Sequence, residues 1–421
     1  MFRTIRFVLT IAFIAALLAA CVGRANQSLP PAPQVKPVSA SEAPDLPVIQ
    51  IARHPGPVDY SSINPDPDLP QKYDPNSQNP FQNDYRSADL SRLDLSHSLD
   101  GLLFSDFDSK TTWPPAERMP AGFDPRQIME IGKNPGLGIR SLHQMGITGT
   151  GVGIAIIDQV LLVDHQEYKD RLRLYEEIDP TGADASMHGA AVSSIAVGKT
   201  VGVAPGADLY FIEGFNGKCF NVPAMYHCLA QAVRRILQIN SQLPADRKIR
   251  VISIARGYRP GEDGSDDWKA SMLEAKSAGL LVVSSSIQDI YGFKFQALGR
   301  APLADPDLVT SYEPGLFWAS SYFAGQQFSD RLLVPMDSRT TASPTGVNDY
   351  VFYRQGGWSW SIPYIAGMYA LACQVRPEIT PDEFWKTALK TGQTIQVKHA
   401  GRNYSLGIIL DPQALIAALQ K

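Results

Sequence analysis

The chain has 421 residues, of which 44% are hydrophobic and 19% are charged, an ordinary composition for one large globular domain or two. The formal net charge is −4 and no basic block is present. These values exclude an electrostatic nucleic-acid binder, so no nucleic-acid partner is expected.

The first 21 residues, MFRTIRFVLTIAFIAALLAAC, have the three-part layout of an export signal. Arg3 and Arg6 precede an apolar run over 7–18, and small residues follow. The apolar run is shorter than the roughly 20 residues that a membrane span needs. The ending LAAC resembles that of a bacterial lipoprotein signal, which implies removal of residues 1–20 and lipidation of Cys21. The alternative is an ordinary cleaved signal. The lipoprotein interpretation predicts an extracytoplasmic protein that acyl chains anchor to the membrane or envelope.

Two segments separate this signal from the main domain. Residues 21–84 contain thirteen prolines between Pro30 and Pro80, mixed with polar residues and without periodicity, which predicts a disordered linker. Residues 85–125 contain spaced leucines that would fit one or two short helices or a packed coil. We interpret this segment as an N-terminal extension or a possible prosegment.

From residue 126 to 421, short apolar runs alternate with helix-like segments. Buried strands are predicted at 151–158, 207–215, 249–257 and 280–286. Helix-like segments lie between them, at 188–198, 223–243 and 268–279. The alternation predicts an α/β fold of three layers, in which a mostly parallel sheet has helices on both faces. In such a fold the functional groups lie at the carboxyl ends of the strands.

Three polar residues lie where that architecture places functional groups. Asp158 closes the first predicted strand, and His188 opens the helix-like segment HGAAVSSIAVG. Ser359 follows a glycine pair and opens the apolar segment SWSIPYIAGMYALACQV. A serine becomes a good nucleophile when an imidazole takes its proton and a carboxylate orients that imidazole. Taken singly, the three could instead be a strand cap, a polar helix start and a helix N-cap.

The order Asp, His, Ser and the flanking motifs resemble those of subtilisin-type serine proteases over roughly residues 130–421. GITGTGVGIAIID is similar to that family's entry strand, and His188-Gly189 with VGVAPGADLY is similar to its next two elements. GGWSWSIPYIAG is similar to GTSMASPHVAG, which aligns Ser359 with the nucleophile. The resemblance implies a serine endopeptidase with the triad Asp158, His188 and Ser359, acting on a peptide or protein substrate without a cofactor.

The sequence departs from the family pattern beside the expected oxyanion hole. Where the family has an asparagine, the stretch LLVVSSSIQ places Gln288, which would complete the hole with Ser359. Glutamine offers the same amide donors on a longer side chain, and losing such a donor costs about 3 kcal/mol of transition-state stabilisation. Gln288 as a surface residue is the alternative, with Ser286 as a second candidate donor.

The segment VISIARG is similar to the family's substrate-lining strand, and it assigns Ala255, Arg256 and Gly257 to substrate binding. Arg256 replaces a usual apolar residue. This replacement suggests a preference for acidic substrate side chains, although a solvent-facing arginine would explain it equally well.

Two further groups of residues, one acidic with a histidine and one a pair of cysteines, do not indicate a functional site. Asp164, His165 and Glu167 lie close in sequence but match no helical metal motif, so no metal site is expected. Cys219 and Cys228 could form a local disulfide in an exported protein or remain two buried thiols.

Two rival functions remain open at this point. One is a catalytically inactive subtilisin-like binding or scaffold lipoprotein, which the glutamine at 288 and the two tryptophans beside Ser359 would suit. The other is an esterase or amidase, because the same triad can transfer other acyl groups. The expected protein is a monomer that contacts the membrane only through its N-terminal lipid.

Overall fold

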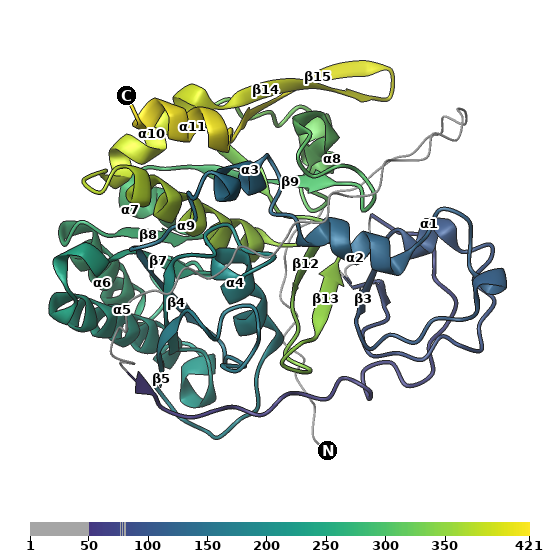
Figure 1. Cartoon of the computed structure of the whole chain (residues 1–421), viewed down its shortest axis with the longest axis horizontal. Helices are drawn as coiled ribbons and strands as arrows, with labels where there is room; N and C mark the ends of the chain where they lie inside the picture. Colours follow the sequence, from purple (N-terminus) through teal and green to yellow (C-terminus); the bar gives the residue numbers. More distant parts are fainter. Residues whose placement is uncertain (1–49, 76, 78, 80) are drawn as a thin grey trace.

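The computed structural model describes residues 50–75, 77, 79 and 81–421 (Figure 1). The predicted signal peptide, the lipidation site Cys21 and the linker up to residue 49 lie outside the described residues. Within the described part, no helix is both long enough and apolar enough to cross a membrane.

A six-stranded sheet runs through the middle of the structure in the order β1-β5-β6-β4-β7-β8, and every neighbouring pair is parallel. The strands are β1 (Gln50–Ile51), β4 (Gly153–Asp158), β5 (Leu172–Glu177), β6 (Asp208–Glu213), β7 (Ile249–Ile254) and β8 (Leu281–Ser284). Every residue of β4, β6 and β8 is buried, as expected for strands that are covered on both faces. The four strands predicted from apolar runs are therefore confirmed.

Helices cover both faces of this sheet. On one face, α5 (Ala224–Gln242) and α6 (Ser265–Ser277) share an apolar cluster with Ala155 and Ile157 of β4. On the other face, α4 (Met187–Val197) and α9 (Trp358–Val375) share a larger cluster with the alternate side chains Ile154 and Ile156. Consecutive residues of β4 thus point into two different cores, and the predicted three-layer α/β fold is confirmed.

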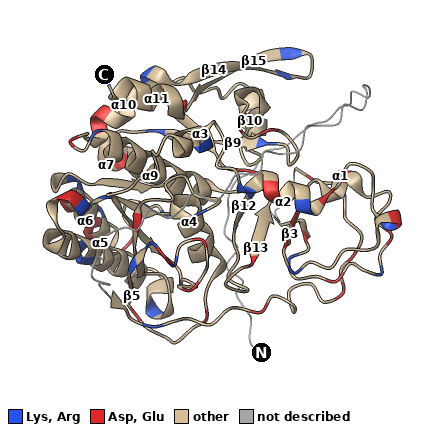
Figure 2. Ribbon diagram, viewed as in Figure 1, with Lys and Arg blue, Asp and Glu red and all other residues tan. Residues whose placement is uncertain are grey.

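The outer surface of α5 and α6 carries charges of both signs (Figure 2). Arg234 on α5 forms ion pairs with Asp267 at 2.8 Å and with Glu274 at 2.9 Å on α6. Pairs as exposed as these contribute little to stability, so the two helices are held mainly by their buried apolar faces.

A second sheet has the order β10-β9-β11-β15-β14 and lies beyond α9. Its strands are β9 (Phe295–Arg300), β10 (Tyr312–Pro314), β11 (Leu332–Pro335), β14 (Gln393–His399) and β15 (Arg402–Ile409). The remaining helices that bear on the fold are α2 (Pro125–Lys133), α3 (Ile139–Gln144), α7 (Ile287–Tyr291), α8 (Ala319–Phe323), α10 (Pro381–Thr391) and α11 (Pro412–Leu419).

Residues 85–125 are built into the domain through a third sheet, with the order β12-β13-β3-β2. Its strands are β2 (Asn83–Asp84), β3 (Ser105–Asp108), β12 (Arg339–Ala342) and β13 (Tyr350–Tyr353), and a short helix α1 (Leu99–Leu102) precedes β3. Phe107 of β3 pairs antiparallel with Phe352 of β13, and both belong to one buried apolar cluster. The segment therefore shares a core with residues far along the chain.

The predicted disordered linker is wrong for residues 50–75 and 81–84. Strand β1 adds to the exposed edge of β5, Arg53 forms an ion pair with Glu177 at 2.7 Å, and the N–H of Ala185 donates to the carbonyl of Gly56 at 2.9 Å. Prolines exclude helix but not an extended chain that lies on a surface, and the edge of β5 offers unpaired backbone groups to such a chain. Figure 1 shows this segment running along one side of the domain.

Candidate active site

Asp158 and His188 meet at the carboxyl edge of the central sheet. Asp158 ends β4 and is 2% exposed, and its Oδ1 accepts hydrogen bonds from His188 Nδ1 at 2.6 Å and from the N–H of Gln159 at 2.8 Å. A carboxylate only accepts hydrogen bonds, so the proton of neutral His188 lies on Nδ1 and its Nε2 is left as a base.

The turn after Asp158 and the start of α4 are tied together. Ser186, the N-cap of α4, accepts from the N–H of His188 at 3.3 Å and donates from its hydroxyl to Gln159 Oε1. Gly189 packs so closely here that a Cβ would lie 2.4 Å from the carbonyl oxygen of Gln159. Neither Gln159 nor Ser186 was predicted to take part in the site, although Gln159 directly follows Asp158 in the sequence.

Ser359 lies in the first turn of α9, whose N-cap is Gly357. Its side chain is half-buried, and within the described residues it forms no hydrogen bond with His188. The next residue, Trp360, packs on the His188 ring with 5.6 Å between centroids, and α9 packs against α4. The structure thus places Ser359 on the helix that adjoins His188. Ser361, by contrast, is fully buried, in agreement with a structural role.

Two buried carboxylates hold the chain that leads into Ser359. Asp106 of β3 accepts from the N–H of Arg354 at 2.6 Å, and Asp337 accepts from the N–H of Gly356 at 2.8 Å. Burial raises the pKa of Asp106 to about 8 and that of Asp337 to about 7. Neither residue was predicted from the sequence, because nothing in a local pattern reveals a contact between residues so far apart.

The two tryptophans beside Ser359 pack away from each other. Trp358 donates from its indole N–H to Gln296 Oε1 at 2.7 Å and contacts the rings of Phe295 and Phe317, with centroids 5.5 and 6.1 Å away. Trp360 contacts His188 from the other side. The tryptophans therefore anchor the first turn of α9 between the second sheet and α4.

The predicted oxyanion donor Gln288 is the second residue of α7, which follows β8 closely. Its side chain is exposed and has no hydrogen-bond partner among the described residues. The second candidate, Ser286, is buried, and its hydroxyl already accepts from the N–H of Tyr258 at 3.1 Å. The Ser286 hydroxyl is therefore held inside the domain, whereas the Gln288 amide is exposed and its donors are free within the described structure.

The predicted substrate-binding residues continue β7 at the edge that carries Asp158. Ile254 is paired with Ile157 of β4, so Ala255 follows beside Asp158. The carbonyl of Arg256 accepts from the N–H of Ser285 at 3.0 Å. The side chain of Arg256 is exposed, and its guanidinium carbon lies 5.9 Å from the centre of the Phe215 ring.

Opposing effects set the pKa of His188. Burial of the ring lowers its pKa, but the charge of Asp158 and the hydrogen bond to it outweigh burial, so the pKa is raised above the ordinary value of 6.5. The positive charge of Arg256 acts in the lowering direction. The site therefore gains a neutral His188 only as the pH rises through this elevated pKa.

The cluster of Asp164, His165 and Glu167 does not converge on a common point. Asp164 pairs with His54 at 2.8 Å, and His165 Nε2 bonds the carbonyl of Asp349 at 2.8 Å. Glu167 accepts from the hydroxyl of Thr200 at 2.6 Å. Within the described residues, no group of three or more potential ligands is arranged to hold a metal ion.

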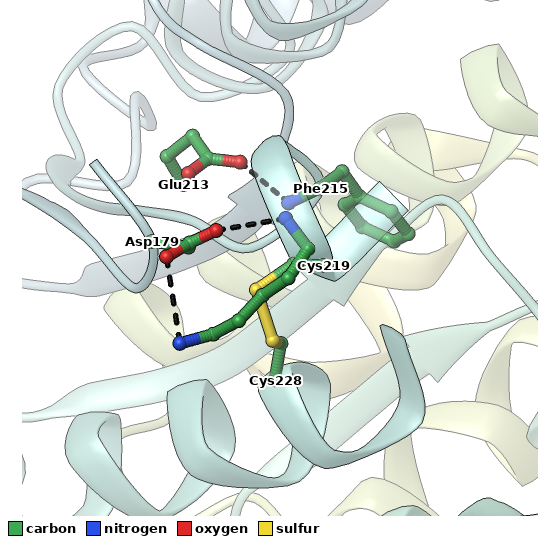
Figure 3. Close-up of a disulfide and its surroundings, with 6 residues drawn as sticks. Asp179, Glu213, Phe215, Cys219 and Cys228 are labelled. Carbon is green, nitrogen blue, oxygen red and sulfur yellow. Dashed lines mark hydrogen bonds and ion pairs between the residues drawn. A yellow bond between two sulfur atoms is a disulfide. The ribbon is translucent and has the colours of Figure 1, made fainter. Parts of the chain in front are cut away.

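Cys219 and Cys228 are joined in a disulfide, with Cα atoms 5.7 Å apart (Figure 3). The bond connects the turn η2 (Gly217–Phe220), which follows Phe215, to the second turn of α5. Cys373 is buried and unpaired. Of the two alternatives that the sequence left open, the structure has the disulfide.

The sequence of this chain is similar to a protein family and to two characterised proteases. Residues 149–292, which contain Asp158 and His188 and end before Ser359, match the model of the subtilase family. The chain is 26% identical over 273 residues to an extracellular serine proteinase from a Thermus species, covering 62% of this chain and 60% of that protein. It is 23% identical over 274 residues to the subtilisin-like protease PopC of Myxococcus xanthus, covering 58% of this chain and 56% of that protein. The matches thus span less than two thirds of each relative.

Solved structures with a similar arrangement include fervidolysin from Fervidobacterium pennivorans, a keratinolytic enzyme related to subtilisin. It is 16% identical, with a TM-score of 0.49 over 69% of this chain and 47% of that chain. The A-subunit of the AB5 toxin from E. coli is 14% identical, with a TM-score of 0.49 over 68% of this chain and 98% of that chain.

We predict that Arg256→Leu raises the pKa of His188, because the substitution removes a positive charge that lowers it. An NMR titration of the imidazole C–H signals would measure the shift. Arg259→Leu is the matched control: this arginine is 78% exposed on the same loop and lies 3.7 Å from Glu262. A His188 pKa that stays constant or falls in Arg256→Leu would contradict the prediction.

Proposed function

Because the chain belongs to the subtilase family, we propose that it is a serine endopeptidase that hydrolyses peptide bonds through an acyl-enzyme. The observation that carries the proposal is the 2.6 Å hydrogen bond between buried Asp158 and His188. His188 lies on α4, which packs against α9, the helix that bears Ser359. A buried carboxylate, an imidazole with a free Nε2 and a half-buried hydroxyl on the adjoining helix are the parts that acyl transfer requires.

In the proposed reaction, Ser359 Oγ attacks the carbonyl carbon of the scissile peptide bond while His188 Nε2 takes the hydroxyl proton. Asp158 keeps the imidazole in the required tautomer and stabilises the imidazolium. The tetrahedral intermediate collapses as His188 gives its proton to the leaving amine. Water then attacks the acyl-enzyme, with His188 again taking and returning a proton, and the acid product and Ser359 are released.

The negative oxygen of the tetrahedral intermediate needs hydrogen-bond donors. The N–H of Ser359 at the start of α9 is one, and the helix dipole favours negative charge at this end. We assign the second donor to the Gln288 side chain, which is exposed and unpaired within the described structure. The backbone of Ala255 and Gly257 would pair with an extended peptide at the adjoining edge.

A fluorophosphonate probe tests the proposed nucleophile directly. We expect the purified protein to be labelled and Ser359→Ala to remain unlabelled, since the probe reacts with an activated serine. Ser361→Ala is a matched control in the same turn and should still label, because the Ser361 hydroxyl is buried and without a partner in the described structure. Folded native protein that does not label would support an inactive binding module instead. Cleavage of esters without cleavage of peptides would support an esterase.

The role of Gln288 makes a separate prediction. Gln288→Ala should lower kcat by about 10²- to 10³-fold and leave KM almost constant, because an oxyanion donor acts mainly in the transition state. Steady-state kinetics on a chromogenic peptide would measure both constants. Gln288→Asn, which keeps the amide on a shorter side chain, should retain more activity than the alanine variant. A kcat reduced less than threefold in Gln288→Ala would remove this residue from the mechanism.

We also propose that the enzyme acts outside the cytoplasm, tethered by a lipid on Cys21. The support is the lipoprotein-like signal, the disulfide between Cys219 and Cys228, and the extracellular serine proteinase among the relatives. The extension 50–125 would stay attached, because it shares a core and a sheet with residues 339–353.

Mass spectrometry of the mature protein tests both parts of this proposal. We expect the mature chain to begin at a lipid-modified Cys21 and to contain residues 50–125. Cys21→Ser should abolish the lipid and release the protein from the membrane fraction. A mature chain that begins after residue 125 would instead identify the extension as a prosegment that is removed.

A further inference from the structure

Arg256 presents an unpaired positive charge beside the proposed active site. Its side chain is exposed, and no ion pair or side-chain hydrogen bond connects it to any other described residue. The contact it does make is with the face of Phe215, 5.9 Å from the ring centre. Stacking of this kind orients a guanidinium while leaving its five N–H donors available.

Two carboxylates on the adjoining segments, Glu262 after Arg256 and Glu213 before Phe215, have other partners. Glu262 accepts from the hydroxyl of Tyr226 at 2.6 Å and lies 3.7 Å from Arg259. Glu213 is fully buried and accepts from the N–H of Phe215 at 2.5 Å. The described chain thus supplies no counter-ion for Arg256.

Phe215, the aromatic platform for Arg256, begins a loop that is restrained by a disulfide and by backbone hydrogen bonds (Figure 3). Phe215 follows β6, and the loop after it is closed by the disulfide between Cys219 and Cys228. Asp179 accepts from the N–H of Lys218 at 2.8 Å on the same loop. A platform restrained in this way loses little conformational entropy when a ligand binds, which favours recognition.

Arg256 lies in the segment after β7 that would pair with the substrate. It lies between Ala255 and Gly257, and successive residues of an extended peptide paired with this segment would point to alternate sides. The charge of Arg256 also reaches His188, where it acts on the imidazole. In the proposed complex, one of these side chains would lie against Arg256 while the scissile bond is at Ser359.

We propose that Arg256 and Phe215 form a specificity subsite for a carboxylate side chain, Asp or Glu, of a peptide substrate. The subsite rests on the proposed peptidase function. The guanidinium would donate two parallel hydrogen bonds to the carboxylate, and the ring of Phe215 would cover the methylene groups of the substrate side chain. The acidic residue would lie on the amino-terminal side of the scissile bond, where the substrate pairs with residues 255–257.

Paired peptides that differ only by Glu against Gln, placed at each position before the scissile bond, test this subsite. For the native enzyme we expect kcat/KM to favour Glu by about 3- to 10-fold at one position, the range of a partly exposed charge-assisted pair. The ratio should fall to about 1 in Arg256→Leu and below 1 in Arg256→Glu. Arg259→Leu, which removes a neighbouring exposed charge already near Glu262, should keep the native ratio.

The fluorophosphonate reaction separates failure of the subsite from failure of the enzyme. Native protein that labels and cleaves peptides with a Glu-to-Gln ratio of 1 at every position would overturn the subsite alone. A preference for Glu that persists in Arg256→Leu would also overturn it. Native protein that neither labels nor cleaves would overturn the peptidase function and the subsite together.

Discussion

Asp158 is a charged side chain that water scarcely reaches, and a carboxylate in such a place must receive hydrogen bonds from the protein. Two of its donors are His188 Nδ1 and the N–H of Gln159. Satisfying this one carboxylate fixes the turn after β4, and that turn fixes the start of α4 through Ser186. The imidazole orientation is therefore a consequence of burying the charge.

The parallel sheet explains why the other groups gather at the same place. Neighbouring parallel strands end at one edge, so the segments after β4, β6, β7 and β8 lie together although they are far apart in sequence. Asp158 ends β4, and Phe215, Arg256 and Gln288 follow β6, β7 and β8. The residues proposed for catalysis and for substrate recognition can then be substituted independently, because each follows or ends a different strand of one sheet.

The sequence was informative wherever local pattern decides structure. The buried strands and the helices of the central layers follow from apolar runs and periodicity. The candidates Asp158, His188 and Ser359 were selected from their places at element ends and from the family resemblance of their flanking motifs. The structure of the N-terminal extension was harder to predict, because β1 and β2 have only two residues each and form through pairing with β5 and β3, not through a local pattern. The high proline content led to the wrong prediction of disorder, since prolines exclude helical conformations but do not prevent a chain from packing on a neighbouring strand. Asp106 and Asp337 could not be identified for the same reason: their roles exist only through tertiary contacts.

The hydrogen bond between Asp106 and the N–H of Arg354 spans 248 positions of the chain. Contacts of such high sequence separation require a long loop to be closed, which costs entropy and slows folding. The segment that presents Ser359 thus depends on a strand made near the beginning of the chain meeting one made near its end. A chain released or translocated only in part could form the pair of Asp158 and His188, but the segment that carries Ser359, the proposed nucleophile, would not be held in place. Topology would then delay the proposed activity until the whole polypeptide has arrived and folded.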